Sequence, residues 1–411
     1  MPSFVDSAAS FLASRPDASA RRASWDAFAA QGLPDASDEV WRYAPLGELA
    51  LDSFGVPEGP SGAVESDFAR ALGAGAALVV RVVDGFLVDA GRPPSGVSVD
   101  APTALDSISG VPLLERYEGD TFALLNAALC PGATRVRVDA GVTLDRPVVV
   151  VHHVGASAAF PRTVVDLGRG ASATVVEYVE GGAGALVVPL SEYHVAENAA
   201  LRLITYQRLD ASAWHIARST AFLEKDARMS QSVIGMGSHY DRSRNDAEMI
   251  GAGSENELGT TYLGSGNQVH DFRTRQYHRG PRSRSTLLSK GAVAGMSRSV
   301  YTGLIEIEKG AKRTDARQTN HNLLLSSTAH ADSVPNLDIR ENDVMCAHAS
   351  SVGPLDALQL WYLESRGVEP GEAERLIIQG FFTEMLVALP RDLARLVEED
   401  VSGILSQVRR S

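Results

Sequence analysis

Hydrophobic and polar positions alternate along the middle of the chain. Short runs of β-branched residues recur between about residues 133 and 340, at 135–138, 148–151, 174–176 and 201–204 among others. An apolar residue at every second position is typical of a β-strand with one buried face. The middle of the chain is therefore predicted to be mainly β, with almost no helix.

Turn signals separate these strand-like runs at a regular interval. A Gly, Asn or Asp followed by a small residue or Pro stands at 170–171, 198–199, 226–227, 253–254, 280–281 and 310–311, with spacings of 28, 28, 27, 27 and 30 residues. Such a period indicates a solenoid of stacked coils, and the simplest one is a right-handed parallel β-helix. A β-sandwich is the alternative, but its turns would recur every ~8–12 residues. The period favours the β-helix.

Helical patterns flank the predicted β-helix. Apolar residues stand at helical spacing at Phe4, Ala8 and Phe11 and again at Trp25 and Phe28. After the β-rich part, helices are expected over 354–365, 372–389 and 391–409. The pattern divides the chain into an N-terminal helical region at 1–60, a mixed α/β connecting region at 61–130, a β-helix core at 131–345 and a C-terminal helical region at 346–411.

Charge and targeting signals narrow the function classes. The 411 residues include 51 Asp and Glu against 38 Lys and Arg, giving a formal net charge of −13. A nucleic-acid partner is not expected, because binding to phosphates requires a basic surface. The start of the chain shows no secretory signal, and Arg81 and Asp84 interrupt the most apolar stretch, 71–88. A cytoplasmic protein without membrane spans is predicted.

The common catalytic motifs are missing from the sequence. It contains no G-x-x-x-x-G-K-[ST] or G-x-G-x-x-G pattern, so the chain is not expected to hydrolyse ATP by itself, and it lacks G-x-S-x-G and H-E-x-x-H, the commonest hydrolase signatures. A polysaccharide-active β-helix is an alternative from another class, and it would need paired carboxylates. The candidate carboxylates stand beside turns, where a solvated acidic loop is the favoured interpretation: Asp241, Asp246, Glu248, Glu255 and Glu257.

Cys346 and His348 are the candidate metal ligands. In an extended segment, residues two apart share a face, so this thiol and imidazole would project together, and both suit iron or iron–sulfur species. Two ligands alone form an open site, and a buried thiol with a hydrogen-bonded His is the alternative. The adjacent His152 and His153 would point to opposite faces of a strand and cannot readily bind one ion together.

The carboxyl-terminal third carries a family resemblance. It rests on VPNLDI at 334–339, DVMCAHASSVGPLD at 343–356 and WYLESRGV at 361–368, with SKG at 289–291, GLI at 303–305, AKRTDARQTNHNLLLS at 311–326 and WRYAPL at 41–46. These segments resemble the SufB/SufD family of iron–sulfur cluster assembly proteins. His321 stands where the SufB branch is expected to carry a functional Cys, and Ala347 and Ala349 flank His348 where that branch carries Glu. Both departures favour the SufD branch.

The resemblance implies a scaffold subunit in a larger complex. Its expected partners are a SufB paralogue and a dimer of the SufC ATPase, and His348 matches the His implicated in forming a nascent, transient iron–sulfur cluster shared with SufB. A flavin in the assembled complex is compatible with the family. The C-terminal helices are expected to dock the ATPase through Leu355, Leu358, Trp361, Leu376, Ile377 and Phe381. A purely structural subunit, with all chemistry in SufB, is the alternative.

Overall fold

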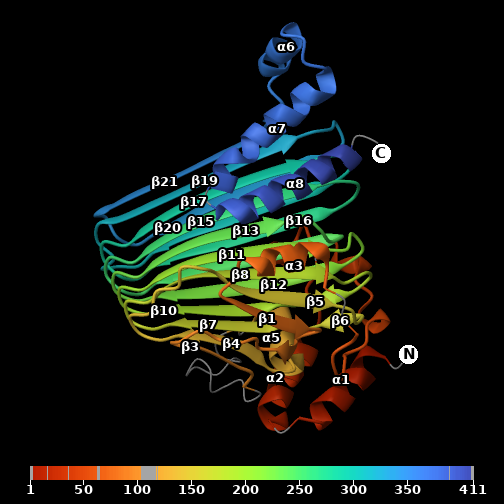
Figure 1. Cartoon of the computed structure of the whole chain (residues 1–411), viewed down its shortest axis with the longest axis vertical. Coiled ribbons are helices and arrows are strands. Elements are labelled where there is room, and N and C mark those ends of the chain that lie inside the picture. The colour runs from red at the N-terminus through yellow and green to blue at the C-terminus, as the bar shows by residue number, and fades with distance from the viewer. Residues whose placement is uncertain are drawn as a thin grey trace.

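Two facing β-sheets wind into a parallel β-helix whose coils stack along the long axis of the molecule (Figure 1). The computed structural model describes residues 3–408, apart from positions 16, 36, 63–64, 103–116, 118 and 388. Helices lie at both ends of the β-helix and against its sides. The predicted fold class, a parallel β-helix between two helical regions, is confirmed.

Ten strands form the first sheet, called sheet A. In spatial order they are β2 (Phe86–Asp89), β1 (Leu78–Val83), β5 (Val148–Val154), β8 (Ser172–Gly181), β11 (Ala200–Leu209), β13 (Arg228–Gly235), β15 (Glu255–Gly264), β17 (Arg284–Val293), β19 (Thr314–Leu324) and β21 (Val344–Pro354). All of these neighbours pair in parallel except β1 and β2, which are antiparallel.

Sheet B faces sheet A across the interior. Its strands are β20 (His330–Ile339), β18 (Arg298–Ile307), β16 (Val269–His278), β14 (Tyr240–Met249), β12 (Trp214–Leu223), β10 (Leu190–Val195), β7 (Arg162–Leu167), β4 (Ala133–Val138) and β3 (Val97–Asp100), with the short β6 (Ala158–Ala159) and β9 (Leu186–Val187) beside them. Parallel pairing places equivalent residues of successive coils in rows. Val175 of β8, Leu203 of β11 and Gln231 of β13 form one such row.

The turn signals of the sequence are the corners of the coils. Gly170, Asn198, Asp226, Gly253 and Gly310 have positive φ angles, between 54° and 100°. Gly, Asn and Asp adopt this left-handed conformation more readily than other residues. At the signal over 280–281, the left-handed residue is instead Arg282, two positions later.

The N-terminal end of the β-helix is covered by helices. They are α1 (Phe4–Ala13), α2 (Ala18–Gln31) and α5 (Thr121–Leu129). After α2 the chain also forms three single-turn helices, at Glu39–Trp41, Leu46–Glu48 and Leu51–Ser53. Phe4, Phe11 and Phe28 share one apolar core with Phe122 of α5. The predicted apolar spacing of this region is therefore the buried face of its helices. A further helix, α3 (Asp67–Ala74), lies on the outer face of sheet A.

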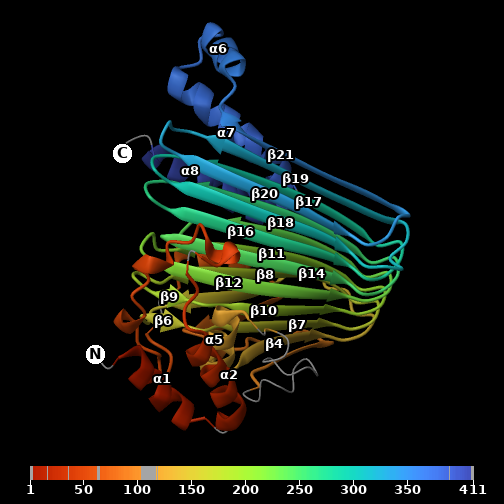
Figure 2. The same ribbon diagram turned by 180° about the vertical axis from the view of Figure 1, so that it is seen from behind.

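Three helices follow the last strand. They are α6 (Ala357–Ser365), α7 (Pro370–Val387) and α8 (Arg391–Val408). Val397 and Val401 of α8 pack in one apolar cluster with Ile204 and Tyr206 on the outer face of sheet A. In contrast, α6 projects beyond the end of the β-helix (Figures 1 and 2). None of the described helices is long and apolar enough to cross a membrane.

The last strand is longer than the hydrophobic pattern indicates. The sequence pattern placed the end of the β-helix core at residue 345, whereas β21 continues to Pro354 and the first C-terminal helix begins at Ala357. Apart from Val352, the residues between Ala347 and Gly353 are small or polar, so they show no apolar alternation. They form a strand because they pair with β19.

Candidate functional site

The C-terminal end of the β-helix is open. Among the described strands, β21 has β19 as its neighbour and β20 has β18, and both lie at the ends of their sheets. Exposed edge strands present unpaired backbone N–H and C=O groups to another chain. Exposed apolar side chains on these two strands add to this surface: Val334, Leu337, Ile339, Met345 and Val352. We call these two strands and their exposed side chains the open end.

Cys346 and His348 lie together on the open end. Both belong to β21, so their side chains share one face of the strand, as their spacing predicted. Cys346 is the register partner of Ala316 and His348 that of Gln318, and these two partners are buried inside the β-helix. The thiol and imidazole therefore stand over the interior at its open end, with Cys346 half-buried and His348 exposed.

The Cys346 thiol is held in its protonated form. Partial burial raises its pKa, and the nearby Asp315 carboxylate raises it further. Iron binds the thiolate, so Cys346 must lose its proton before it can act as a ligand. A positive charge brought by a bound metal or by another chain would favour that loss.

This pair does not form a metal site by itself. In the described part of the chain, no group of three His, Cys, Asp or Glu side chains is arranged to hold a metal ion. A thiol and an imidazole supply two ligands, whereas tetrahedral iron or zinc sites use four. A metal ion bound here would need further ligands from outside the described residues.

His321 points away from this pair. It is the register partner of Ser351, and its Nδ1 lies 2.5 Å from the Ser351 Oγ. On the neighbouring strand, the Lys290 Nζ donates a hydrogen bond to the Phe381 carbonyl of α7, 2.9 Å away. His321 therefore lies on the outer side of sheet A beside α7, on the face of the sheet opposite to His348.

The six expected docking side chains differ in exposure. Leu355 and Phe381 are partly buried against the apolar cluster on sheet A, so they hold the helices in place. Ile377 is half-buried. Leu358, Trp361 and Leu376 are exposed, with 75%, 66% and 40% of their surfaces accessible. No residue of α6 is buried, which makes this helix the most available apolar surface of the C-terminal region.

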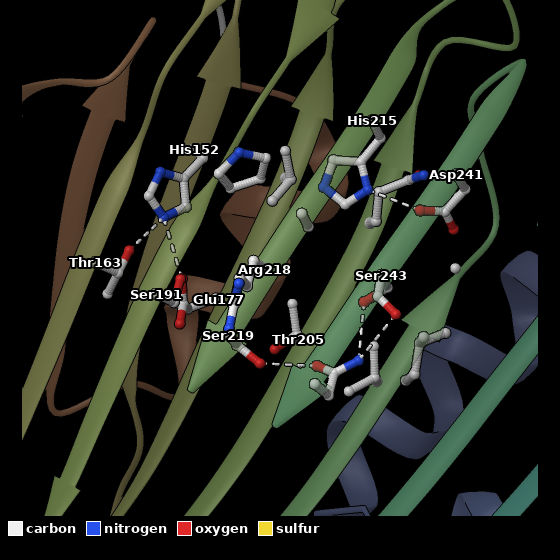
Figure 3. Close-up of a pocket in the computed structure, with 18 of the residues that line it drawn as sticks. His152, Thr163, Glu177, Ser191, Thr205, His215, Arg218, Ser219, Asp241 and Ser243 are labelled. Carbon is white, nitrogen blue, oxygen red and sulfur yellow. Dashed lines mark hydrogen bonds and ion pairs between the residues drawn. The ribbon is translucent and has the colours of Figure 1, made fainter. Parts of the chain in front are cut away.

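Several other candidates have their side chains engaged in internal contacts. His152 faces the interior, 3.5 Å from a Glu177 carboxylate oxygen, whereas His153 faces outward toward Glu180, so their predicted opposite orientation is confirmed. Asp241 lies inside the β-helix, where its carboxylate contacts His215 (Figure 3) and, through its other oxygen, His270. Burial alone would raise the pKa of Asp241, but hydrogen bonds from the two imidazoles outweigh it and lower that pKa.

The acidic set of the polysaccharide alternative is dispersed. Asp241 is buried inside the β-helix, and Asp246 pairs with Arg218 and Arg244 on the opposite face of the same strand. Glu255 and Glu257 belong to β15, in the other sheet. Glu255 and Glu257 share the outer face of β15, where Glu255 lies 3.8 Å from the guanidinium groups of Arg228 and Arg284, so the acidic set does not gather at one site.

Sequence reasoning missed a polar cluster beside the Cys346–His348 pair. The Asn320 Nδ2 donates a hydrogen bond to the Ser333 Oγ at 2.9 Å, and the Ser350 Oγ donates to the same oxygen at 2.7 Å. Together with Gln318, these residues line the mouth of the interior. Extending the turn period to the final coils could have aligned Asn320 with Ser350, but the irregular last spacings hide this alignment.

The sequence of the chain is similar to those of known proteins. The family model described as SUF system FeS cluster assembly, SufBD core domain, matches residues 150–381. The chain is 30% identical over 366 residues to the iron–sulfur cluster assembly protein SufD of Escherichia coli (strain K12), covering 87% of this chain and 86% of that protein. It is 31% identical over 291 residues to the SufD of Bacillus subtilis (strain 168), covering 67% and 66%. A SufBD family protein of Mycobacterium tuberculosis (strain ATCC 25618 / H37Rv) is 30% identical over 386 residues, covering 89% and 87%.

Proposed function

The chain belongs to the SufBD family of iron–sulfur cluster assembly proteins, and we propose that it is a SufD-type, non-catalytic scaffold subunit that builds a nascent cluster with a SufB paralogue. In this proposal the cluster is cargo, assembled where the open end meets the partner and then passed on. A SufC ATPase dimer docks on the C-terminal helices and drives the rearrangement.

The position of His348 and Cys346 on an unpaired edge strand carries the proposal. A backbone edge with exposed apolar side chains suits pairing with another β-sheet. The two potential ligands lie on that edge, and the described residues offer no third. A site that another chain must complete is what a cluster shared between two subunits requires.

Each ligand has a defined chemical task in this proposal. A neutral His348 imidazole ligates iron through a ring nitrogen, and a thiolate of the partner carries the sulfur. Cys346 becomes a ligand only after deprotonation, because burial and Asp315 hold it as a thiol in the free chain. His348 is therefore the principal ligand and Cys346 a conditional one.

Docking of the ATPase is assigned to α6 and the adjoining part of α7. The exposed Leu358, Trp361 and Leu376 supply the contact surface. Beside them lies a groove of about 330 Å³, lined mainly by apolar side chains from the end of β19 and from the three C-terminal helices. Large exposed apolar side chains of this kind mark protein-binding surfaces. We assign no described residue to a flavin.

The experiment that tests the proposal replaces His348. His348→Ala is expected to leave the complex with SufB and SufC assembled but to lower the amount of cluster formed in an anaerobic reconstitution. His330→Ala is the matched control, because His330 is also exposed on an edge strand and contacts Asp332 of its own strand. Its cluster yield should equal that of the wild type.

The purely structural alternative makes the opposite prediction. If all chemistry resides in SufB, His348→Ala forms clusters at the normal yield, and only variants that disturb assembly reduce it. An intact complex with normal cluster yield in the His348→Ala variant would therefore refute the proposed role. Failure to co-purify with any ATPase would refute the complex itself.

A further inference from the structure

The outer face of sheet B carries a row of buried residues. They are register partners on successive strands from β12 to β20, and their sequence neighbours His215 and Asp241 face the interior instead. The row ends at Asp332 of the edge strand β20, which is half-buried. Side chains on the outside of a sheet are buried only where another part of the chain covers them. The other four members are at most 4% exposed: Ile216, Arg242, Asp271 and Val300.

The segment that follows α2 lies over this row, and we call its residues 38–49 the strap. The Trp41 ring lies over the Arg242 guanidinium, with 3.7 Å between the ring centroid and the Cζ atom. The Arg242 Nη1 also donates a hydrogen bond to the Val40 carbonyl, 3.3 Å away. Trp41 and Leu46 belong to the apolar core of the N-terminal helices, which anchors the strap. Figure 2 shows the red part of the chain after α2 rising beside sheet B to the level of β16.

Tyr43 extends the strap to the last coils. The Arg298 Cζ of β18 lies 4.8 Å from the centroid of the Tyr43 ring, and an aromatic face attracts a guanidinium placed over it. The Arg298 Nε and Nη2 donate hydrogen bonds to the Asp332 Oδ2, at 2.9 and 2.6 Å. This ion pair joins β18 to the edge strand β20. Tyr43 therefore supports, through Arg298, the contact that holds β20 to its neighbour.

The other edge strand has different surroundings. Met345, on the outer face of β21, is 61% exposed. The contacts of Trp41 and Tyr43 with Arg242 and Arg298 lie on sheet B, whereas β21 belongs to sheet A. The open end is therefore asymmetric, because the strap supports only one of its two strands through these contacts.

We propose that the strap controls how readily β20 opens, with Trp41 as its anchor and Tyr43 as the positioning residue for Arg298. This assigns a role to the segment WRYAPL at 41–46, which the scaffold function leaves without one. In the proposed scaffold, a partner that pairs with β20 meets a strand whose order the N-terminal segment sets. This last step rests on the proposed function, whereas the control of β20 does not.

Hydrogen exchange of the full chain, without a partner, tests the proposal. In Tyr43→Ala the protected amides of β20 are expected to exchange about fivefold faster than in the wild type, because the Arg298–Asp332 pair loses its aromatic cover. The amides of β21 should keep the wild-type rate. Mass spectrometry of peptides from the two strands measures both rates.

Two variants of the strap are the controls. Tyr43→Phe keeps the ring over Arg298 and should show the wild-type rate in β20. Arg42→Ala removes the neighbouring side chain, which is exposed, and should also leave that rate unchanged. Exchange as fast in either control as in Tyr43→Ala would overturn the role of the aromatic ring.

The comparison of the two edge strands gives the decision. Faster exchange of β20 alone in Tyr43→Ala, with wild-type rates in both controls, supports the proposal. An unchanged rate in β20 overturns it, and so does an equal increase in β21. If Tyr43→Ala does not fold, Tyr43→Leu, which keeps apolar bulk but removes the ring, takes its place in the same comparison. Because no partner is present, failure of this test leaves the proposed scaffold role untouched.

Discussion

His278 shows how strongly the interior controls a single residue. Its Nδ1 lies 2.8 Å from the Ser283 Oγ and its Nε2 lies 2.8 Å from the Ser285 Oγ. Burial lowers the pKa of His278 to about 4, whereas an unfolded histidine titrates near about 6.5. Between these two values the unfolded chain binds a proton that the folded chain excludes. Acid therefore favours the unfolded state through this residue.

We predict that His278 makes the folded protein sensitive to mild acid. Its contribution should lower the free energy of unfolding by about 2 kcal/mol between pH 7 and pH 5, because the folded pKa lies below the unfolded one. Urea unfolding of the wild type and of His278→Gln at both pH values measures this. The loss between pH 7 and pH 5 should be smaller in the variant by that amount. An equal loss in both proteins would contradict the prediction.

Sequence spacing predicted part of the candidate site at this scale. Because β21 is a strand, the alternation rule placed Cys346 and His348 on one face correctly. The alternation rule could not show that this face lies toward the interior of the β-helix, because the direction of the face depends on the register of His348 against Gln318. The unpaired amide of Gln318 was equally hidden, because it lies inside only when β19 and β18 face each other.

At the scale of elements, the preference of the corner residue itself accounts for some turns between strands, whereas hydrogen bonds to neighbouring coils account for others. The corners at Asn198 and Asp226 were predictable, because these residues favour the left-handed conformation that a tight turn needs. Arg282 and Arg313 also have positive φ angles, although no residue preference predicts this. At these corners the coils above and below fix the path of the chain: the Arg313 N–H donates to the Asp343 carbonyl, 2.6 Å away.

The projecting helix α6 should contribute binding energy rather than stability. We predict that Leu358→Ala and Trp361→Ala each weaken binding of the ATPase partner by about 2 kcal/mol, roughly thirtyfold in Kd. Both side chains are exposed, so the free energy of unfolding should change by less than about 0.5 kcal/mol. Titration calorimetry with the purified ATPase and urea unfolding measure the two effects.

A matched variant separates docking from general surface changes. Val88→Ala removes an exposed apolar side chain from β2, at the other end of the molecule, and should leave ATPase binding unchanged. Wild-type affinity in both α6 variants would place the docking surface elsewhere. A large loss of stability in either variant would show that the helix packs more tightly than its exposure indicates.

At the scale of the whole molecule, the two ends of the β-helix differ. The N-terminal end finishes with the antiparallel strands β2 and β3 and is covered by α1, α2 and α5 (Figure 1). The C-terminal end finishes with two parallel edge strands that carry exposed apolar residues. The period of the sequence predicted the stack of coils, but not which end is covered, because covering depends on contacts between distant segments.

We predict that the chain self-associates through its open end when no partner is present. Unpaired edges with apolar side chains favour pairing between copies. Sedimentation equilibrium of the chain alone should show a dimer whose population rises with concentration. Leu337→Lys, which places a charge on β20, should yield a monomer. Val88→Lys, at the opposite end, should behave like the wild type, and dimers of equal strength in both variants would exclude the open end as the contact.

The stacking of coils also determines how order spreads through the molecule. Each inner coil packs against two neighbouring coils, so its free energy of unfolding is the sum of its intrinsic stability and of two interfaces with those neighbours. The last coil has only one such interface. β20 and β21 should therefore open locally at a lower free energy than the inner strands, and their amides should exchange with deuterium first. A second chain docked on this end would act as the missing coil. Its binding would then be coupled to completing the order of the very strand that carries His348.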